Sequence, residues 1–295
     1  MTNHLTEPLI GKLLEDRYLI LQNLAEQSYG KVYLAKDELL GVNVSLKLLN
    51  PLLLSEKFLN QFIQEARLGA SFRDDDCLLP RVLDFGLYED RMPFYVFDIR
   101  EYLLLAEFFN NNSVVIHQFI ELASQLSKAL SLVHVGPAGQ MKDFGPMLHR
   151  DINPRTILMS EGSVEARIQL LNFEKALARE QCLTGDVSHV FLGSLAYCSP
   201  EQIFALPMDV RSDIYSFGVT LYYLLTNTYP VQSVSDSVSS WSLAHKTSLA
   251  IALKTQECIF PIPDWLRRLV MSCIEHSPEN RPQTMEEVTA ALRQF

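Results

Sequence analysis

Short stretches rich in aliphatic and aromatic residues dominate the first third of the chain. They occupy residues 17–21, 31–35, 42–49 and 94–97. Runs of this length and composition are typical of β-strands. We therefore expect a sheet to be built mainly from the N-terminal part of the sequence.

Apolar residues at helical spacing appear once within this part and then dominate the rest of the chain. The early case spans residues 58–69, and a long amphipathic helix is predicted for 117–134. A further apolar segment, 209–221, is long enough to form a central helix. Before the last helix, Thr284 and Glu287 have the spacing of a capping box, in which each side chain satisfies a backbone N–H of the first turn.

Composition limits the kind of protein that carries this pattern. The chain has 295 residues, of which 48% are apolar, enough to bury a large core. Acidic residues outnumber basic ones by 35 to 25, and no basic block stands out. Attraction to a phosphate backbone is therefore absent, and no nucleic-acid partner is expected.

The cysteines and the hydropathy point to a reducing, aqueous compartment. The five cysteines are scattered and form no C-x-x-C pair, which fits reduced thiols better than a disulfide framework or a zinc site. No apolar run reaches the roughly 18 residues needed to span a bilayer, and the N-terminus lacks a signal-peptide pattern. We expect a cytoplasmic protein without a membrane span.

The stretch 148–158 carries the candidate chemistry. It places His149, Arg150 and Asp151 in a short loop between two apolar runs. This stretch resembles the catalytic loop of the protein-kinase family, H-R-D-L-x-x-x-N, in which the Asp accepts the proton of the substrate hydroxyl. The resemblance implies a catalytic role for Asp151. Thr156, however, stands where the family has its metal-binding Asn.

A second group of residues resembles the phosphate-binding part of the same family. Lys47 lies in an apolar strand and resembles the lysine of V-A-I-K, and the resemblance implies that Glu65, on the following helix, forms an ion pair with it. A lysine on a solvated strand face is the alternative explanation. The glycine-rich loop is degraded, because Ala25 and Gln27 replace the first two glycines and only Gly30 remains.

The metal-binding signature of the family is altered as well. D-F-G occurs at 84–86 and at 143–145, but both copies precede His149, whereas the family signature follows the catalytic loop. Asp84 is better explained as the start of a hairpin turn. The strand that should lead into the signature ends in Asn172, a neutral residue, and is followed by Glu174, which we consider as a substitute carboxylate. With Thr156 and Asn172 neutral, no metal site is expected.

Other positions acquire an expected role only from the resemblance. Phe97, Asp98 and Ile99 stand where kinases have the gatekeeper and the hinge that hydrogen-bonds adenine. Further residues implied to enclose the nucleotide are Leu24, Val32, Ser45 and Leu158. Asp213 is implied to hold the catalytic-loop backbone, and Arg281 to form a buried structural ion pair with Glu201.

The matches cover residues 17–295 in the order of the family, most similar to bacterial serine/threonine kinases related to eukaryotic ones. The implied fold is α+β and bilobal: a leader at 1–16, a small β-rich lobe at 17–100 and a larger helical lobe at 101–295. No tandem repeat is visible.

The residues that hold the fold match the family, whereas those that hold metal and phosphate do not. Our main hypothesis is a pseudokinase that regulates or scaffolds by binding a partner protein, with Asp151 retained to brace its loop. It would require no cofactor, and any ATP would bind weakly or without metal. The alternative is a weakly active or unconventional serine/threonine kinase that transfers the γ-phosphate of ATP to protein hydroxyls.

Overall fold

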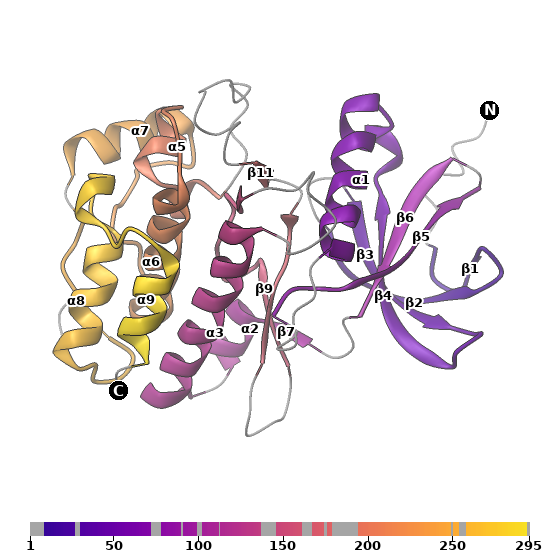
Figure 1. Cartoon of the computed structure of the whole chain (residues 1–295), viewed down its shortest axis with the longest axis horizontal. Helices are drawn as coiled ribbons and strands as arrows, with labels where there is room; N and C mark the ends of the chain where they lie inside the picture. The colour runs from indigo at the N-terminus through magenta and orange to yellow at the C-terminus, as the bar shows by residue number, and fades with distance from the viewer. Residues whose placement is uncertain are drawn as a thin grey trace. The chain divides into compact units, whose positions relative to one another are not determined.

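The computed structural model describes most of the chain. The chain forms two compact units, Met1–Tyr102 and Leu103–Phe295 (Figure 1). The first is built on a sheet with one long helix and the second is mainly helical, so the predicted α+β class is confirmed. The described residues are 9–26, 30–71, 78–89, 91–98, 102–111, 113–136, 146–160, 167–173, 176–178, 194–248, 250–253 and 258–293.

The first unit contains a six-stranded antiparallel sheet with the strand order β1-β2-β3-β4-β6-β5. One long helix, α1 (Glu56–Ser71), follows β4 and a short 3₁₀ helix, η2 (Pro51–Leu53). The predicted strands and the early helix are therefore present. The strands are β1 (Leu13–Leu14), β2 (Tyr18–Glu26), β3 (Gly30–Asp37), β4 (Val42–Leu49), β5 (Val82–Tyr88) and β6 (Met92–Phe97).

Side chains from the turn between β1 and β2 contact β5, and so connect the two outermost strands of this sheet. Arg17 donates to Asp84 of β5 over 3.0 Å, and the carboxylate of Glu15 accepts from the backbone N–H of Leu87 over 2.8 Å. Leu14 is fully buried in the same core. The prediction of a leader at 1–16 is thus wrong for its last part, because Leu13–Leu14 belongs to the sheet.

The first D-F-G sequence is explained by the sheet. The predicted hairpin is present between β5 and β6, but Asp84 lies inside β5 and does not start the turn, which comes after Tyr88. The Asp84 carboxylate accepts a hydrogen bond of 2.6 Å from the Tyr18 hydroxyl. Its role is to hold two strands together. The second D-F-G, at 143–145, lies outside the described residues.

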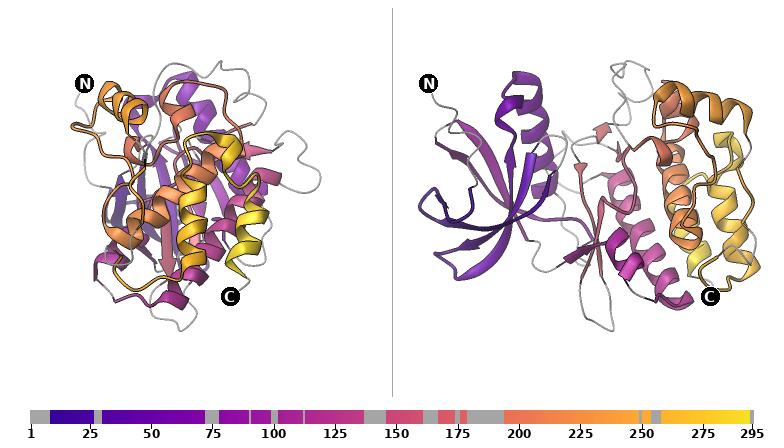
Figure 2. Two further views of the ribbon diagram at one scale, coloured as in Figure 1. Left: turned by 90° about the vertical axis from the view of Figure 1, so that its left-hand side faces the viewer. Right: turned by 180° about the vertical axis from the view of Figure 1, so that it is seen from behind.

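The second unit is organised around α6 (Val210–Thr226), which is buried along most of its length. Asp209 caps its first turn by accepting from the backbone N–H of Arg211. Two small sheets accompany the helices, one with the order β10-β9-β7 and one that pairs β11 with β8 (Figure 2). The remaining elements are β7 (Tyr102–Leu104), α2 (Leu105–Asn111), α3 (Ile116–Val135), β8 (Met147–Leu148), β9 (Ile157–Ser160), β10 (Ile168–Leu170), β11 (Leu177–Ala178), η4 (Leu195–Tyr197), α5 (Pro200–Ile203), α7 (Val238–Thr247), α8 (Asp264–Cys273), η6 (Pro278–Asn280) and α9 (Met285–Leu292).

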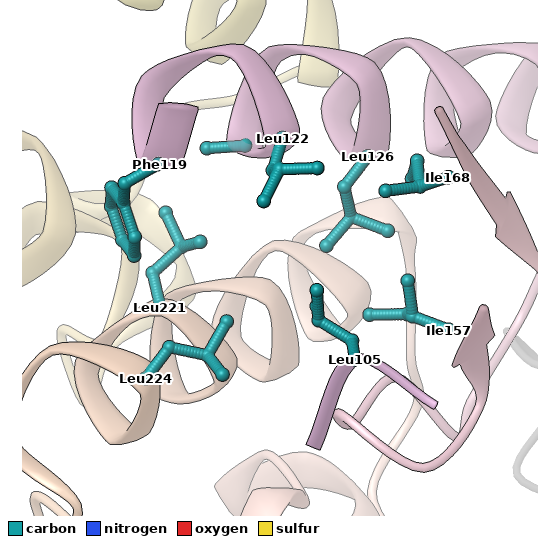
Figure 3. Close-up of a pocket in the computed structure, with 9 residues that line it drawn as sticks. Leu105, Phe119, Leu122, Leu126, Ile157, Ile168, Leu221 and Leu224 are labelled. Carbon is teal, nitrogen blue, oxygen red and sulfur yellow. The ribbon is translucent and has the colours of Figure 1, made fainter. Parts of the chain in front are cut away.

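The core of the second unit forms where α3 meets α6 and the sheet. Figure 3 shows Leu122 and Leu126 of α3 and Leu221 of α6 turned toward a small cavity lined by apolar side chains. Ile157 of β9 and Ile168 of β10 close it from the sheet. This interdigitation fixes β9, and with it the end of the candidate catalytic loop, against the central helices. Among the described residues, no helix is long and apolar enough to cross a membrane.

The last helix begins as the sequence predicted, with one difference. The hydroxyl of Thr284 accepts from the backbone N–H of Glu287 over 3.3 Å. The carboxylate of Glu287 reaches one residue further back than in a standard capping box and accepts from the N–H of Gln283 over 2.8 Å. Two N–H groups at the start of α9 are satisfied in either arrangement.

Candidate active site

The first part of the candidate site is a buried ion pair in the first unit. Lys47 lies on β4, and its Nζ is 2.8 and 3.1 Å from the two carboxylate oxygens of Glu65 on α1. Both side chains are almost fully buried, at 1% and 6% exposure. The alternative of a solvated surface lysine is therefore wrong. Burial of a charged pair costs free energy unless the geometry is good, so this pair fixes the lysine firmly in one position.

Strand register gathers four of the predicted nucleotide-binding residues on one face of the sheet. Val32 is paired with Lys47, and Ser45 with Phe97. Directly paired residues share a face, as do residues two apart on one strand. These four side chains therefore lie on the same face, and all are buried.

The other predicted nucleotide contacts of this unit differ in their surroundings. Leu24, on β2, is 46% exposed. The backbone N–H of Asp98 donates to the carbonyl of Arg81, and its carboxylate accepts from the N–H of the same residue over 2.9 Å. Ile99 lies outside the described residues. A nucleotide-binding role for all of them stays a prediction.

The second part of the site is the loop between β8 and β9, in the second unit. The carboxylate of Asp213, from α6, accepts from the backbone N–H of His149 over 2.7 Å and from that of Arg150 over 2.9 Å. Arg150 has a φ of 68°, a left-handed conformation that costs free energy in a residue with a side chain. The two hydrogen bonds offset this strain and present Asp151, the next residue. Asp213 thus makes the backbone contacts that the resemblance implied.

His134 is a member of this arrangement that sequence reasoning missed. His134 lies at the C-terminal end of α3, and its Nε2 is 2.9 Å from Asp213 Oδ2. Both groups are buried. Burial alone would raise the pKa of Asp213, but the hydrogen bond and charge of His134 and the N–H of Arg150 hold that pKa below its usual value. The sequence showed His134 only as the end of an amphipathic helix, because its partner lies 79 positions away.

Asp151 is held in place by its own loop and by Ser194. Its Oδ1 accepts from Asn153 Nδ2 and from the backbone N–H of Ser194, both over 3.2 Å. The backbone N–H of Ser194 thus ties the candidate catalytic loop to the segment before η4. Asp151 is nearly buried, with 6% exposure.

Thr156 closes the same loop through its hydroxyl. Thr156 Oγ1 lies 2.8 Å from the carbonyl oxygen of Asp151 and 3.0 Å from that of Asn153, and it accepts from the N–H of Asn153. Asn153 Oδ1 in turn accepts from the N–H of Arg155 over 2.9 Å. Asn153 stands where the resemblance implies a lysine that steadies the transferred phosphoryl group, and Thr156 stands where it implies a metal ligand. Both neutral residues are thus engaged within the loop.

Asn172 follows β10 with a φ of 67°, and its Oδ1 is buried without a hydrogen-bond partner. An amide oxygen can ligate Mg²⁺, but it lacks the negative charge of a carboxylate. Among the described residues, no group of three or more His, Cys, Asp or Glu side chains could hold a metal ion. The donors at positions 156 and 172 therefore fit a divalent ion only weakly. Glu174, considered as a substitute ligand, lies outside the described residues.

Comparison with known proteins decides the family. The family model described as "Protein kinase domain" matches residues 18–292. The chain belongs to the protein kinase family. Leu158, the remaining predicted nucleotide contact of this kinase domain, is partly buried and paired with Gln169 in the β9–β10 ladder.

Relatives of this kinase domain carry serine/threonine kinase names. The chain is 32% identical over 283 residues to "Serine/threonine-protein kinase A" of Synechocystis sp., covering 95% of this chain and 53% of that protein. It is 29% identical to a probable serine/threonine-protein kinase of Clostridium acetobutylicum, covering 96% and 40%, and 27% identical to PrkC of Bacillus subtilis, covering 97% and 41%. The chain thus spans about half, or less, of the length of these relatives.

The kinase domain also contains the predicted ion pair between Arg281 and Glu201. The guanidinium lies 2.8 Å from the Glu201 carboxylate, and Arg281 is almost fully buried. The other oxygen of Glu201 accepts from Ser212 Oγ over 3.1 Å. This pair joins α5, which follows the loop carrying Ser194, to the segment before α9. It supports the site through the scaffold and does not touch Asp151.

Proposed function

We propose that this kinase domain is a slow serine/threonine protein kinase, which uses ATP to phosphorylate protein hydroxyls. The observation that carries the proposal is the buried ion pair between Lys47 and Glu65, 2.8 Å long. It fixes the position of the positively charged lysine amine, which in the proposed reaction contacts the phosphates of ATP. The serine/threonine kinase names of the relatives favour this alternative over our main hypothesis of a pseudokinase.

In the proposed reaction, the substrate hydroxyl oxygen bonds to the γ-phosphorus and the bond between that phosphorus and its bridging oxygen breaks, which releases ADP. Asp151 accepts the hydroxyl proton and passes it to solvent. Lys47 stabilises the phosphate oxygens by its positive charge. A bound Mg²⁺ would supply further neutralisation of the phosphates. In this chain, Thr156 and Asn172 stand at the positions where the family has its metal ligands, and both are neutral.

The reaction is expected to be slow because the electrostatic stabilisers are incomplete. Removal of one well-placed stabiliser costs about 3–4 kcal/mol, or about 10²–10³ in rate. Asn153, Thr156 and Asn172 each replace a residue with which the family handles metal or phosphate. Their effects are not additive, so the total loss is smaller than the product of the three.

A second candidate, the pseudokinase that acts by binding a partner protein, is favoured by one specific observation. The hydroxyl of Thr156 bonds to the carbonyl oxygens of Asp151 and Asn153, and the side-chain amide of Asn153 donates to the Asp151 carboxylate. This arrangement maintains the loop without a metal or a phosphate. It supports a domain in which these residues maintain the loop instead of binding metal or phosphate.

Phosphate transfer from ATP to a protein substrate distinguishes the two candidates. We expect slow transfer by the unmodified chain with Mg²⁺ or Mn²⁺, and loss of that transfer in Asp151→Asn. Asp236→Asn, which removes an exposed carboxylate of the same unit, should leave the rate unchanged.

The converse change tests the cause of the slow rate. The double variant Thr156→Asn/Asn172→Asp restores the metal ligands of the family and should raise the rate by about 10²-fold or more. If the unmodified chain transfers no more phosphate than Asp151→Asn, the kinase proposal fails and the pseudokinase stands.

A further inference from the structure

The loop that carries Asp151 turns a single charged side chain outward. Every residue of 147–157 is buried or half-buried except Arg155, which is exposed. The loop uses only the backbone N–H of Arg155, which donates to Asn153 Oδ1. Loops that are held rigidly by buried groups commonly present the side chains that contact a ligand. The proposed reaction gives the positive charge of Arg155 no role, so this charge is available to a ligand.

One amide side chain fixes the backbone of Arg155 relative to the Asp151 carboxylate. Asn153 Nδ2 donates to Asp151 Oδ1 over 3.2 Å, and Asn153 Oδ1 accepts from the N–H of Arg155 over 2.9 Å. The carbonyl of Pro154 accepts from the N–H of Ala106, in α2, over 3.1 Å. The backbone that carries the cation is thus held close to the group that receives the hydroxyl proton in the proposed reaction.

The charge of Arg155 also acts on η4. Burial raises the pKa of the Tyr197 hydroxyl, and its hydrogen bond with Tyr229 acts in the same direction, whereas the positive charge of Arg155 acts against both. Tyr197 lies three positions after Ser194, whose N–H donates to Asp151 Oδ1. Asp151, Arg155 and η4 therefore lie in one region of the second unit. A substrate that brings its hydroxyl to Asp151 has its neighbouring residues close to Arg155.

Within the described part of the chain, no acidic side chain forms an ion pair with Arg155. This includes Glu107, an exposed residue of α2 that follows Ala106. The whole chain has a formal net charge of -10, so long-range attraction does not favour an anionic substrate. Selection for negative charge in a substrate has to come from a local contact, and Arg155 provides one.

We propose that Arg155 binds an anionic side chain of the protein substrate, within about three residues of the hydroxyl that accepts the phosphate. Arg155 thereby selects the substrates of the kinase proposed above, and its role rests on that function. An extended peptide advances about 3.3 Å per residue, so a long side chain beside the acceptor reaches only its near neighbours. The guanidinium can pair with a carboxylate or a phosphate through two parallel hydrogen bonds. The substrate is therefore an acidic segment, charged by Asp or Glu or by a residue phosphorylated beforehand.

Peptides with a single serine in an alanine background test the proposal. Glutamate, lysine or phosphothreonine replaces alanine at successive positions on each side of the serine. We expect glutamate at the position that reaches Arg155 to lower KM by about fivefold or more, with kcat nearly unchanged, and lysine there to raise KM. A decrease with phosphothreonine alone would identify a substrate phosphorylated beforehand, and a decrease with glutamate would identify an acidic segment.

Charge reversal at Arg155 identifies the contact. Arg155→Glu should lose the preference for the anionic peptide and favour the lysine peptide, and Arg155→Ala should not distinguish the two. Both variants retain the backbone N–H that the loop uses, so the loop should keep its structure. Arg268→Glu changes the net charge by the same amount at an exposed position of α8. It is the matched control and should keep the preference of the unmodified chain.

Fluorescence anisotropy of the labelled peptides measures the same preference as dissociation constants, without phosphate transfer. If no peptide is phosphorylated but the anionic ones still bind more tightly through Arg155, the kinase function fails and the anion contact stands. Equal KM values and dissociation constants for the anionic and alanine peptides would overturn the role of Arg155, as would a preference that survives Arg155→Glu. In either case, measurable transfer to the peptides would leave the proposed kinase function intact.

Discussion

Arg281 shows how one buried residue can join several segments. Its guanidinium makes five hydrogen bonds, two with Glu201 and three with the backbone carbonyls of Arg211, Glu275 and His276. Its CZ atom also lies 4.9 Å from the centroid of the Tyr215 ring. The residue thus ties α5, α6 and the segment before α9 together.

We expect Arg281→Ala to reduce the free energy of unfolding by about 3–5 kcal/mol, because Glu201 is left as a buried charge without its partner. Urea unfolding measures this difference. Arg211→Ala is the control, since it breaks a pair with Asp209 in which both side chains are 23% exposed and should cost about 1 kcal/mol or less. Equal losses in the two variants would contradict a special role for burial.

His245 gives a prediction for pH dependence. It lies on α7 with its ring 6.3 Å from that of Trp241, and burial lowers its pKa to about 4. In the unfolded chain a histidine has a pKa of about 6.5. Below about pH 6.5 the unfolded state therefore binds a proton that the folded state does not bind, and the folded state loses stability.

The free energy of unfolding should fall as the pH decreases from about 6.5 to 4, by up to about 1.4 kcal/mol per pH unit from His245. The total is about 3 kcal/mol. His245→Phe should flatten the profile in this range, whereas His117→Gln, at an exposed position of α3, should not change it. An unchanged slope in His245→Phe would show that other groups produce the dependence.

At the scale of elements, the close approach of α1 to β5 depends on one missing side chain. A Cβ atom at Gly69 would lie 2.6 Å from Val82 Cγ2 and 3.3 Å from the carbonyl oxygen of Pro80. Gly69 is the last residue of the apolar helical pattern at 58–69, and it has no side chain to pack there. The structure supplies the reason, which is contact between helix backbone and strand.

Gly69→Ala should therefore destabilise the chain, by about 1–3 kcal/mol, although alanine favours a helix by about 1 kcal/mol over glycine. Thermal or urea unfolding gives the value. A double-mutant cycle with Val82→Ala checks the cause, because removal of the Val82 methyl groups should relieve the clash and make the double variant more stable than the sum of the single effects predicts. Strict additivity would show that Val82 is not responsible.

For the whole molecule, the candidate residues are divided between the two units. Lys47 and Glu65 belong to the first unit, and Asp151, Thr156 and Asn172 to the second. Binding of a nucleotide can be observed as a change in the unfolding temperature.

We expect ATP to raise the unfolding temperature, and Mg²⁺ to add little to that shift, because the groups at positions 156 and 172 are neutral. The variant Thr156→Asn/Asn172→Asp should make the shift depend on Mg²⁺. Lys246→Ala, which removes an exposed lysine of α7, serves as the control and should behave like the unmodified chain. Stabilisation of the unmodified chain that requires Mg²⁺ would contradict this prediction.

Much of the fold could be predicted because it is recorded in local patterns. Strand runs, helical spacing and the cap at Thr284 depend on residues that are close in the sequence, and all three appear in the structure. The boundary of the sheet could not be predicted in this way. Leu13–Leu14 is too short to show a strand pattern, and it is a strand only because β2 lies beside it.

The sequence by itself determined the order of the motifs, and therefore the family, since chemistry restricts which residue type can stand at each position. It also determined which positions lack a metal ligand. Only the tertiary structure decided which groups meet: His134 with Asp213, the Ser194 N–H with Asp151, and Glu15 with the edge of β5. These contacts join residues that are far apart in the chain. A local sequence pattern cannot predict them, because the two partners come together only when the chain folds.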